Sequence, residues 1–407
     1  MSLQQLFLTG LLACLALPIG AAPPLTSPAI DDLLRQAWEN HPGIQAAQSA
    51  IDAARARSEA AGKPIYNPEL DVDAERTAVT TLSVGINQTI DWGDKRGAQR
   101  QMGNSDVLVA RAELASLRQQ VASEVLMALA RYQSAQEQRQ LATRYGELMG
   151  QLVETTEQRY AAGDLGQLDV ALARVAFSES HMQMARREAE VATQQAALVA
   201  TSGLGLSQWP ALPIPAPPAD PQRDALLAGL PQLVAQQARI ANARAGTELA
   251  RASRRADPTF GLRGGAEEND LLLGLSFSMP LNVRNDFTAE VTAAAQQAVQ
   301  EEKILLDLRR LAASRFDGSL SVYRLTHRAW RQWQNAGQGN LTQQLSLVQR
   351  IWEAGELSTT DYLLQTGQNI NTQITAAELK GDLRLAWVEW LKASGQFGGA
   401  GQTPDSP

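Results

Sequence analysis

The chain of 407 residues carries a formal net charge of −7, and only 5% of its residues are aromatic. The acidic balance argues against a nucleic-acid partner, because nucleic-acid binding needs a basic face. Alanine, glutamine, leucine, arginine and glutamate are abundant, which is the composition of long helices packed side by side.

We interpret residues 1–22 as a secretory signal peptide, because an apolar run leads to small residues at Ala21 and Ala22, where cleavage is expected. A lipidation signal is the alternative. Leu11-Leu-Ala-Cys14 is a loose lipobox, which would leave Cys14 as a lipidated N-terminus. Cys14 is the only cysteine, so the predicted mature chain has none, which suits an oxidising envelope compartment.

The first structural unit, residues 23–204, opens with a helix predicted over about 30–63 that kinks or restarts at His41-Pro42. The spacing of the apolar residues then changes from a helical period to a period of two. Over about residues 69–92, apolar and polar residues alternate in two segments, which predicts a β-hairpin with one apolar face.

Two further helices are predicted in this unit, a long one over about 105–161 and a shorter one over about 168–201. The turn between them, residues 160–169, begins with Tyr160. Gly163 is expected to take the left-handed conformation that ends a helix, and Asp169 to lie three residues after the cap of the next one.

The same plan occurs a second time. The turn at 352–361 begins with Trp352 and repeats Ala, Gly, Leu and Asp at matching places, so that Gly355 lies 192 residues after Gly163 and Asp361 answers Asp169. A whole half of the chain therefore repeats. The predicted parts are a Pro-rich linker at 205–222, a second unit at 223–397 with strands at about 259–283 and one long helix over 286–354, and a disordered tail at 398–407.

No window after the signal segment approaches the roughly 20 apolar residues of a membrane helix. The alternating segments instead have the length and pattern of outer-membrane barrel strands, although a half-buried sheet in a soluble domain has the same period. Four strands cannot close a barrel, and lipid does not tolerate open edges. A trimer would supply twelve strands.

Charged side chains in two places are candidates for function. Asp71, Asp73 and Glu75 would line a barrel lumen if the apolar face meets lipid, and the alternative is an ordinary solvated face. Asp361 would form a threefold ring of carboxylates at a constriction, which attracts cations, and the alternative is a helix cap.

Nothing in the sequence points to catalysis or to a resident cofactor. His41, His181 and His327 are the only histidines and are far apart, so no ligand set for a tight metal site is expected. The sequence offers no nucleophile–base constellation and no phosphate loop. We therefore predict a protein that is not an enzyme.

The doubled plan, the two turns and two short motifs resemble the TolC-type outer-membrane efflux proteins. Asn67-Pro-Glu-Leu70 and Gln88-Thr-Ile-Asp-Trp-Gly-Asp-Lys-Arg96 are similar to motifs of the branch that serves heavy-metal (cobalt-zinc-cadmium) exporters, with Asp94 in place of a second glycine. The resemblance implies a mainly α fold with transmembrane β-hairpins, built from a duplicated helix-hairpin-helix unit. Three copies would form a 12-strand outer-membrane β-barrel continued by a periplasmic α-helical barrel.

The family also implies partners and roles. The duct would be a homotrimer in outer-membrane lipid, and its periplasmic tip would meet a periplasmic adaptor protein joined to an inner-membrane proton-driven pump. The residues expected at the tip and adaptor contact are Tyr160, Gly163, Asp169, Trp352, Gly355 and Asp361. Asp361 matches an aperture position of the family, whereas Leu364 stands where some relatives have a second acid.

The leading hypothesis is a passive exit duct for divalent heavy-metal cations delivered by the pump. Two alternatives stay open: a duct for drugs or type I secreted polypeptides, and a periplasmic coiled-coil scaffold without a pore.

Overall fold

The computed structural model describes residues 27–77, 80–268 and 270–397. The predicted signal peptide with Cys14 and the predicted tail at 398–407 lie outside these ranges. The elements of the first unit are α1 (Pro28–Asn40), α2 (Pro42–Ala61), β1 (Glu69–Arg76), β2 (Thr80–Thr89), α3 (Lys95–Ala161) and α4 (Gln167–Ser202). Those of the second are α5 (Arg223–Ala228), α6 (Pro231–Ser253), β3 (Thr259–Glu267), β4 (Asp270–Ser278), α7 (Thr288–Ala336), α8 (Gln338–Glu353) and α9 (Thr359–Ser394).

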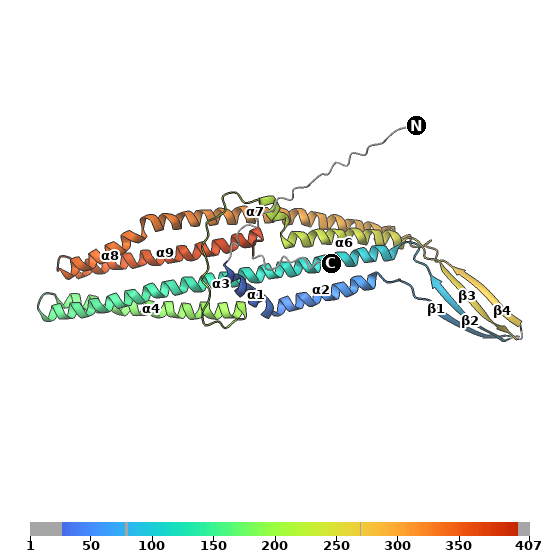
Figure 1. The fold of residues 1–407 in the computed structure, drawn as a ribbon, viewed down its shortest axis with the longest axis horizontal. Coiled ribbons are helices and arrows are strands. Elements are labelled where there is room, and N and C mark those ends of the chain that lie inside the picture. The colour runs from blue at the N-terminus through green and yellow to red at the C-terminus, as the bar shows by residue number, and fades with distance from the viewer. Residues whose placement is uncertain (1–26, 78–79, 269, 398–407) are drawn as a thin grey trace, which may run out of the picture.

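The helices lie side by side in an elongated body, and the strands extend from one end of it (Figure 1). The turns α3–α4 and α8–α9 lie at the opposite end. With 67 residues, α3 is about 100 Å long at 1.5 Å per residue. None of the helices in the described ranges combines the length and the apolarity needed to cross a bilayer.

The duplication is visible in the backbone. The described glycines with positive φ form two pairs 192 residues apart, Gly163 with Gly355 (86° and 78°) and Gly203 with Gly395 (69° and 72°). Each pair closes equivalent helices, because a left-handed residue ends a helix and glycine takes that conformation at no steric cost. The predicted restart at His41 is also confirmed, since His41 caps α2 through its Nδ1, which accepts from the Gly43 N–H at 3.1 Å.

The prediction of one continuous helix over 286–354 is wrong. The helix is interrupted at Gly337, between α7 and α8, whereas the equivalent Gly146 lies inside the unbroken α3. The ring of Trp333 occupies the space beside Gly337, where an added Cβ would meet ring atoms at 2.3 Å. The long helix of the first unit also begins earlier than expected, at Lys95.

The strands form one antiparallel sheet in the order β1-β2-β3-β4, which leaves β1 and β4 as open edges. The hairpins lie inside the predicted spans but are shorter. β2 ends at Thr89, and β4 ends at Ser278, two residues before Pro280, which has no N–H to donate to a ladder.

The apolar side of this sheet is exposed. Its apolar face consists of the even-numbered residues of β1, β2 and β3 and the odd-numbered residues of β4; its polar face consists of the others. Leu271, Leu273 and Leu275 are 81%, 73% and 87% exposed, whereas Ser83 on the polar face is 4% exposed. A soluble sheet would show the reverse, and an apolar surface of this extent marks an interaction site.

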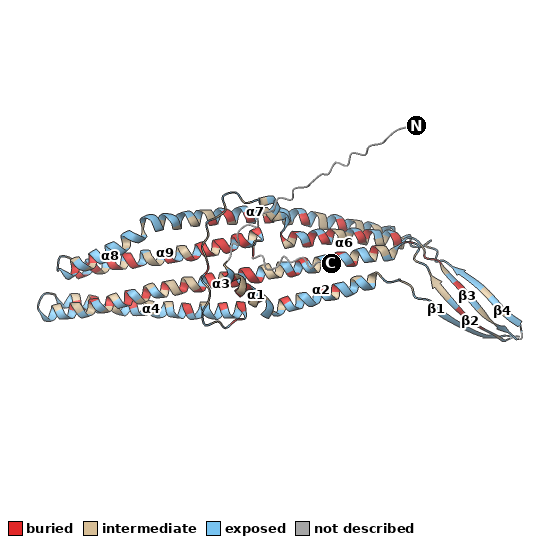
Figure 2. Cartoon of the chain, viewed as in Figure 1, coloured by how far each residue is buried: buried red, intermediate tan, exposed pale blue. Residues whose placement is uncertain are grey.

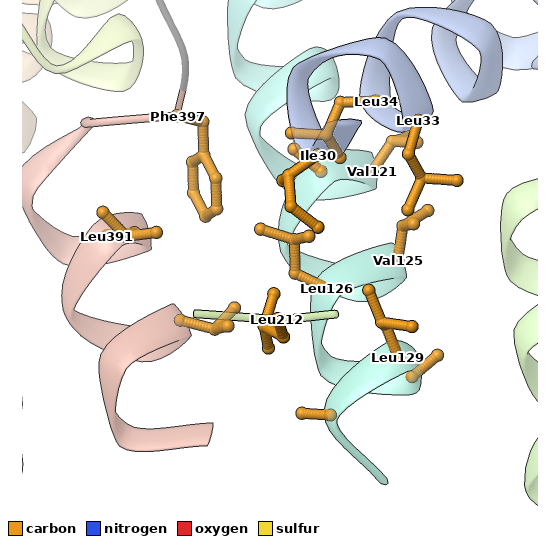
Figure 3. Close-up of a cluster of buried hydrophobic side chains, with 14 of the residues drawn as sticks. Ile30, Leu33, Leu34, Val121, Val125, Leu126, Leu129, Leu212, Leu391 and Phe397 are labelled. Atoms are coloured by element: carbon orange, nitrogen blue, oxygen red, sulfur yellow. The ribbon is translucent and has the colours of Figure 1, made fainter. Parts of the chain in front are cut away.

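Burial concentrates on the inward sides of the helices near the middle of the body (Figure 2). There α1, α3, the end of α9 and Leu212 of the linker form the main core, with Ile30, Leu126 and Leu391 almost fully buried (Figure 3). The linker lies across two helices. Gln133 of α3 donates to the Pro210 carbonyl at 2.7 Å, and Arg324 of α7 donates to the Pro218 carbonyl at 2.9 Å. It therefore acts as a strap between the two units.

A buried carboxylate joins the sheet to the helices. Asp257 Oδ2 accepts from the Tyr66 hydroxyl and from Lys95 Nζ, both at 2.7 Å, and Oδ1 accepts from the Trp92 N–H at 3.2 Å. Burial raises the pKa of Asp257, but the hydrogen bonds from Lys95 and Tyr66 outweigh it and hold the pKa below its usual value. Asp257 belongs to the second unit and its three donors to the first.

Candidate functional site at the helix turns and the polar face of the sheet

The turn between α3 and α4 is a Schellman motif. The Asp164 N–H donates to the Arg159 carbonyl at 2.9 Å, and the Gly163 N–H donates to the Tyr160 carbonyl at 3.0 Å. This pattern requires a left-handed residue at Gly163, as the sequence predicted.

The turn between α8 and α9 repeats this geometry. The Glu356 N–H donates to the Ile351 carbonyl at 3.1 Å, and the Gly355 N–H donates to the Trp352 carbonyl at 3.0 Å. Two turns with the same backbone hydrogen-bond pattern therefore end the body on the same side (Figure 1).

The carboxylates after the turns cap their helices in different ways. Asp169 Oδ2 accepts from the Gly166 N–H at 3.1 Å. In the second turn the Asp361 N–H donates to Ser358 Oγ at 3.1 Å, and the Ser358 hydroxyl donates to Asp361 Oδ2 at 2.6 Å. Asp361 is exposed and Asp169 partly covered, so Asp361 retains more capacity to meet solvent cations.

Arg159 links the two turns. Its Nη1 donates to the Trp352 carbonyl at 3.1 Å, the same oxygen that accepts from Gly355, and its guanidinium lies 5.8 Å from the centre of the Trp352 ring. No local sequence pattern singles out Arg159. The position 192 residues later is Ile351, so a long polar side chain without a counterpart in the repeat was the available signal.

The aromatic residues that lead the two turns have different environments. Tyr160 is 48% exposed, whereas Trp352 is 3% exposed and packs on Tyr362 with ring centres 4.9 Å apart and ring planes tilted by 32°. Burial raises the pKa of Tyr362. The Trp352 side chain thus packs inside the end of the body, and its place in an adaptor contact stays a prediction.

The polar face of the sheet is strongly acidic. The carboxylates on it are Glu69, Asp71, Asp73, Glu75, Glu267 and Asp270. Arg263 is the one cation on this face among the described residues. Every residue of β1 is exposed, so the predicted lumen candidates Asp71, Asp73 and Glu75 stand on a free edge strand.

The histidines have packing and capping roles. His41 caps α2. His181 packs edge-on against Phe177, with ring centres 4.3 Å apart. Burial lowers the pKa of His327. Within the described part of the chain, no three His, Cys, Asp or Glu side chains are grouped as a metal site.

This arrangement of helices, turns and strands has counterparts in known proteins. Residues 33–204 match the family model described as outer membrane efflux protein. The cobalt-zinc-cadmium resistance protein CzcC of Cupriavidus metallidurans is 26% identical over 332 residues, which is 77% of each chain.

Solved structures extend the fold match to the second unit. The outer-membrane channel OprN is similar with a TM-score of 0.76 at 16% identity, covering 91% of each chain. CusC, known from crystal structures of folding and transmembrane channel formation, gives a TM-score of 0.75 at 16% identity and covers 90% of this chain and 92% of its own. The predicted fold class is confirmed, and residues 33–204 of the chain match the outer membrane efflux protein family.

Proposed function

We propose that three copies of this chain form a passive duct through the outer membrane and that the duct carries no catalytic activity of its own. The observation that carries this proposal is the sheet with its apolar face exposed and its polar face less so. Such a face fits lipid, and the open edges of β1 and β4 then require strands from further copies. A scaffold without a pore would not need an exposed apolar face on its sheet.

The helical body would continue the duct into the periplasm. The turns at Gly163 and Gly355 lie at the end far from the sheet, where a periplasmic adaptor would dock and connect the duct to an inner-membrane proton-driven pump. The exposed Tyr160 and Leu168 provide side chains for that contact. Asp361 would contribute one carboxylate per copy to a ring at the entrance.

Divalent metal cations are the cargo that fits best. Six carboxylates against one arginine on the polar face would give the barrel lumen a net charge of −5 per copy, which favours cations. The similarity to the cobalt-zinc-cadmium resistance protein CzcC supports the same cargo. The metal would pass along the duct rather than be held in it.

The test of this function is the growth of a deletion strain in the presence of zinc, cobalt, cadmium or copper, and in the presence of a panel of drugs. Complementing genes would encode the wild type, Asp361→Ala, or Asp169→Ala as the matched cap control. We expect metal hypersensitivity of the deletion, rescue by wild type and Asp169→Ala, and incomplete rescue by Asp361→Ala. Sensitivity to drugs alone would assign a different cargo.

Membrane fractionation tests the duct itself. We expect heat-modifiable trimers in the outer-membrane fraction of the wild-type strain. Monomers in the soluble periplasm would overturn the proposal and favour the scaffold.

A further inference from the structure

Arg263 stands in a row of the sheet that is otherwise nearly bare. The register aligns Asp71 of β1, Gly85 of β2, Arg263 of β3 and Gly274 of β4 on the polar face. Glycines therefore flank the arginine on both sides, so no neighbouring side chain in its row obstructs its stem.

The arginine side chain lies over β4. Its Nε and Cγ are 2.7 and 2.9 Å from the place where a Cβ on Gly274 would be, so a side chain at Gly274 would displace it. The stem thus lies over Gly274 of β4, the strand at the open edge of the sheet. Among the described residues, no carboxylate forms an ion pair with Arg263.

The other open edge has the complementary charge. β1 carries a carboxylate at each of its polar-face positions, Glu69, Asp71, Asp73 and Glu75, spaced by about 7 Å along the strand. None of these four takes part in an ion pair within the described chain.

We infer that, where the β4 edge of one copy meets the β1 edge of the next in the proposed barrel, Arg263 pairs with one of the four β1 carboxylates of that next copy. The inference rests on the proposed trimeric barrel. An acid at every polar-face position gives the arginine a partner in whichever register the two edges meet. Repeated around the barrel, the pair would join each copy to the next.

The test is the thermal stability of the detergent-extracted, full-length trimer, measured as the temperature at which half of it becomes monomer on a gel. We expect Arg263→Glu to lower this temperature by several degrees relative to wild type. Arg255→Glu is the matched control, because Arg255 is exposed outside the strands, and it should leave the temperature unchanged.

Charge reversals on β1 then identify the partner. Arg263→Glu is combined in turn with Glu69→Arg, Asp71→Arg, Asp73→Arg and Glu75→Arg, and one combination should recover most of the lost stability. A second line uses Gly274→Ala, which should weaken the trimer because it displaces the arginine. Gly264→Ala is its control, since the nearest atom to its added Cβ lies 3.6 Å away.

Each outcome is decisive. Equal stability of Arg263→Glu and wild type overturns the pairing, and so does a loss that none of the four reversals repairs. A wild-type protein that is monomeric in the membrane fraction would instead refute the trimer itself, and the pairing with it.

Discussion

Helix α3 and the α7–α8 pair occupy equivalent places in the two units, yet they differ in burial. Of the 67 residues of α3, 22 are buried, against six of 49 in α7 and two of 16 in α8. The duplicated plan therefore fixes where helices run, but the single chain covers only the first of its two long helices. In the proposed duct, the open faces of α7 and α8 would face further copies or the duct interior.

The halves also diverge where the sheet meets the helices. Asp257 is buried with three donors, whereas Asn67, which occupies the equivalent place in the first unit, is exposed. Asp257→Ala should therefore have the largest effect on stability. It would leave Lys95 without its partner at a mostly buried site, a change that costs about 3–5 kcal/mol.

Urea unfolding of the detergent-solubilised protein, followed by circular dichroism, would measure this loss. Asn67→Ala is the matched control and should change the unfolding free energy little. A similar effect of both variants would mean that the two junctions carry equal weight.

The junction should also give the protein a defined pH range of stability. The Asp257 pKa lies below its usual value, so its contribution is present above the pKa of the unfolded carboxyl and is lost as the pH falls through the lowered one. The hydrogen bond to Asp257, together with burial, raises the pKa of Tyr66 to about 12, so the contribution of Tyr66 is present below about 10 and is lost as the pH rises towards 12.

Asp257→Asn should reduce the dependence of stability on pH at both the acid and the alkaline end. The variant lacks the carboxylate that titrates in acid, and it also lacks the charged hydrogen-bond acceptor that raises the pKa of Tyr66. The measurement is the unfolding midpoint from acid to pH 12. An unchanged alkaline limit in the variant would show that Tyr66 does not depend on Asp257.

The features that sequence alone predicted are local. Gly163 and Gly355 end helices through their own backbone preference, and the strands follow from alternation within ten residues. The features it missed need contacts that no local pattern encodes. Asp257 takes its donors from the other unit, and Arg159 reaches the Trp352 carbonyl of the second turn.

The smallest predicted effects concern the break at Gly337. Gly146, at the equivalent place in the first unit, lies inside an unbroken helix, so the same Gly→Ala substitution can be compared in the two units. Gly146→Ala should stabilise the protein by about 0.5–1 kcal/mol, since the nearest atom to its added Cβ is 4.0 Å away and alanine favours a helix. Gly337→Ala should instead cost about 1 kcal/mol, because the new Cβ must displace the Trp333 ring.

The same substitution is predicted to reverse its sign when the ring is removed. In a Trp333→Ala background, Gly337→Ala should raise the unfolding free energy by about 0.5–1 kcal/mol, because α7 and α8 can then form one continuous helix like α3. Urea unfolding of the four proteins completes the cycle. If Gly337→Ala stabilises the wild-type background as much as Gly146→Ala does, the Trp333 ring does not hold the break, and the divergence of the two long helices has its cause elsewhere.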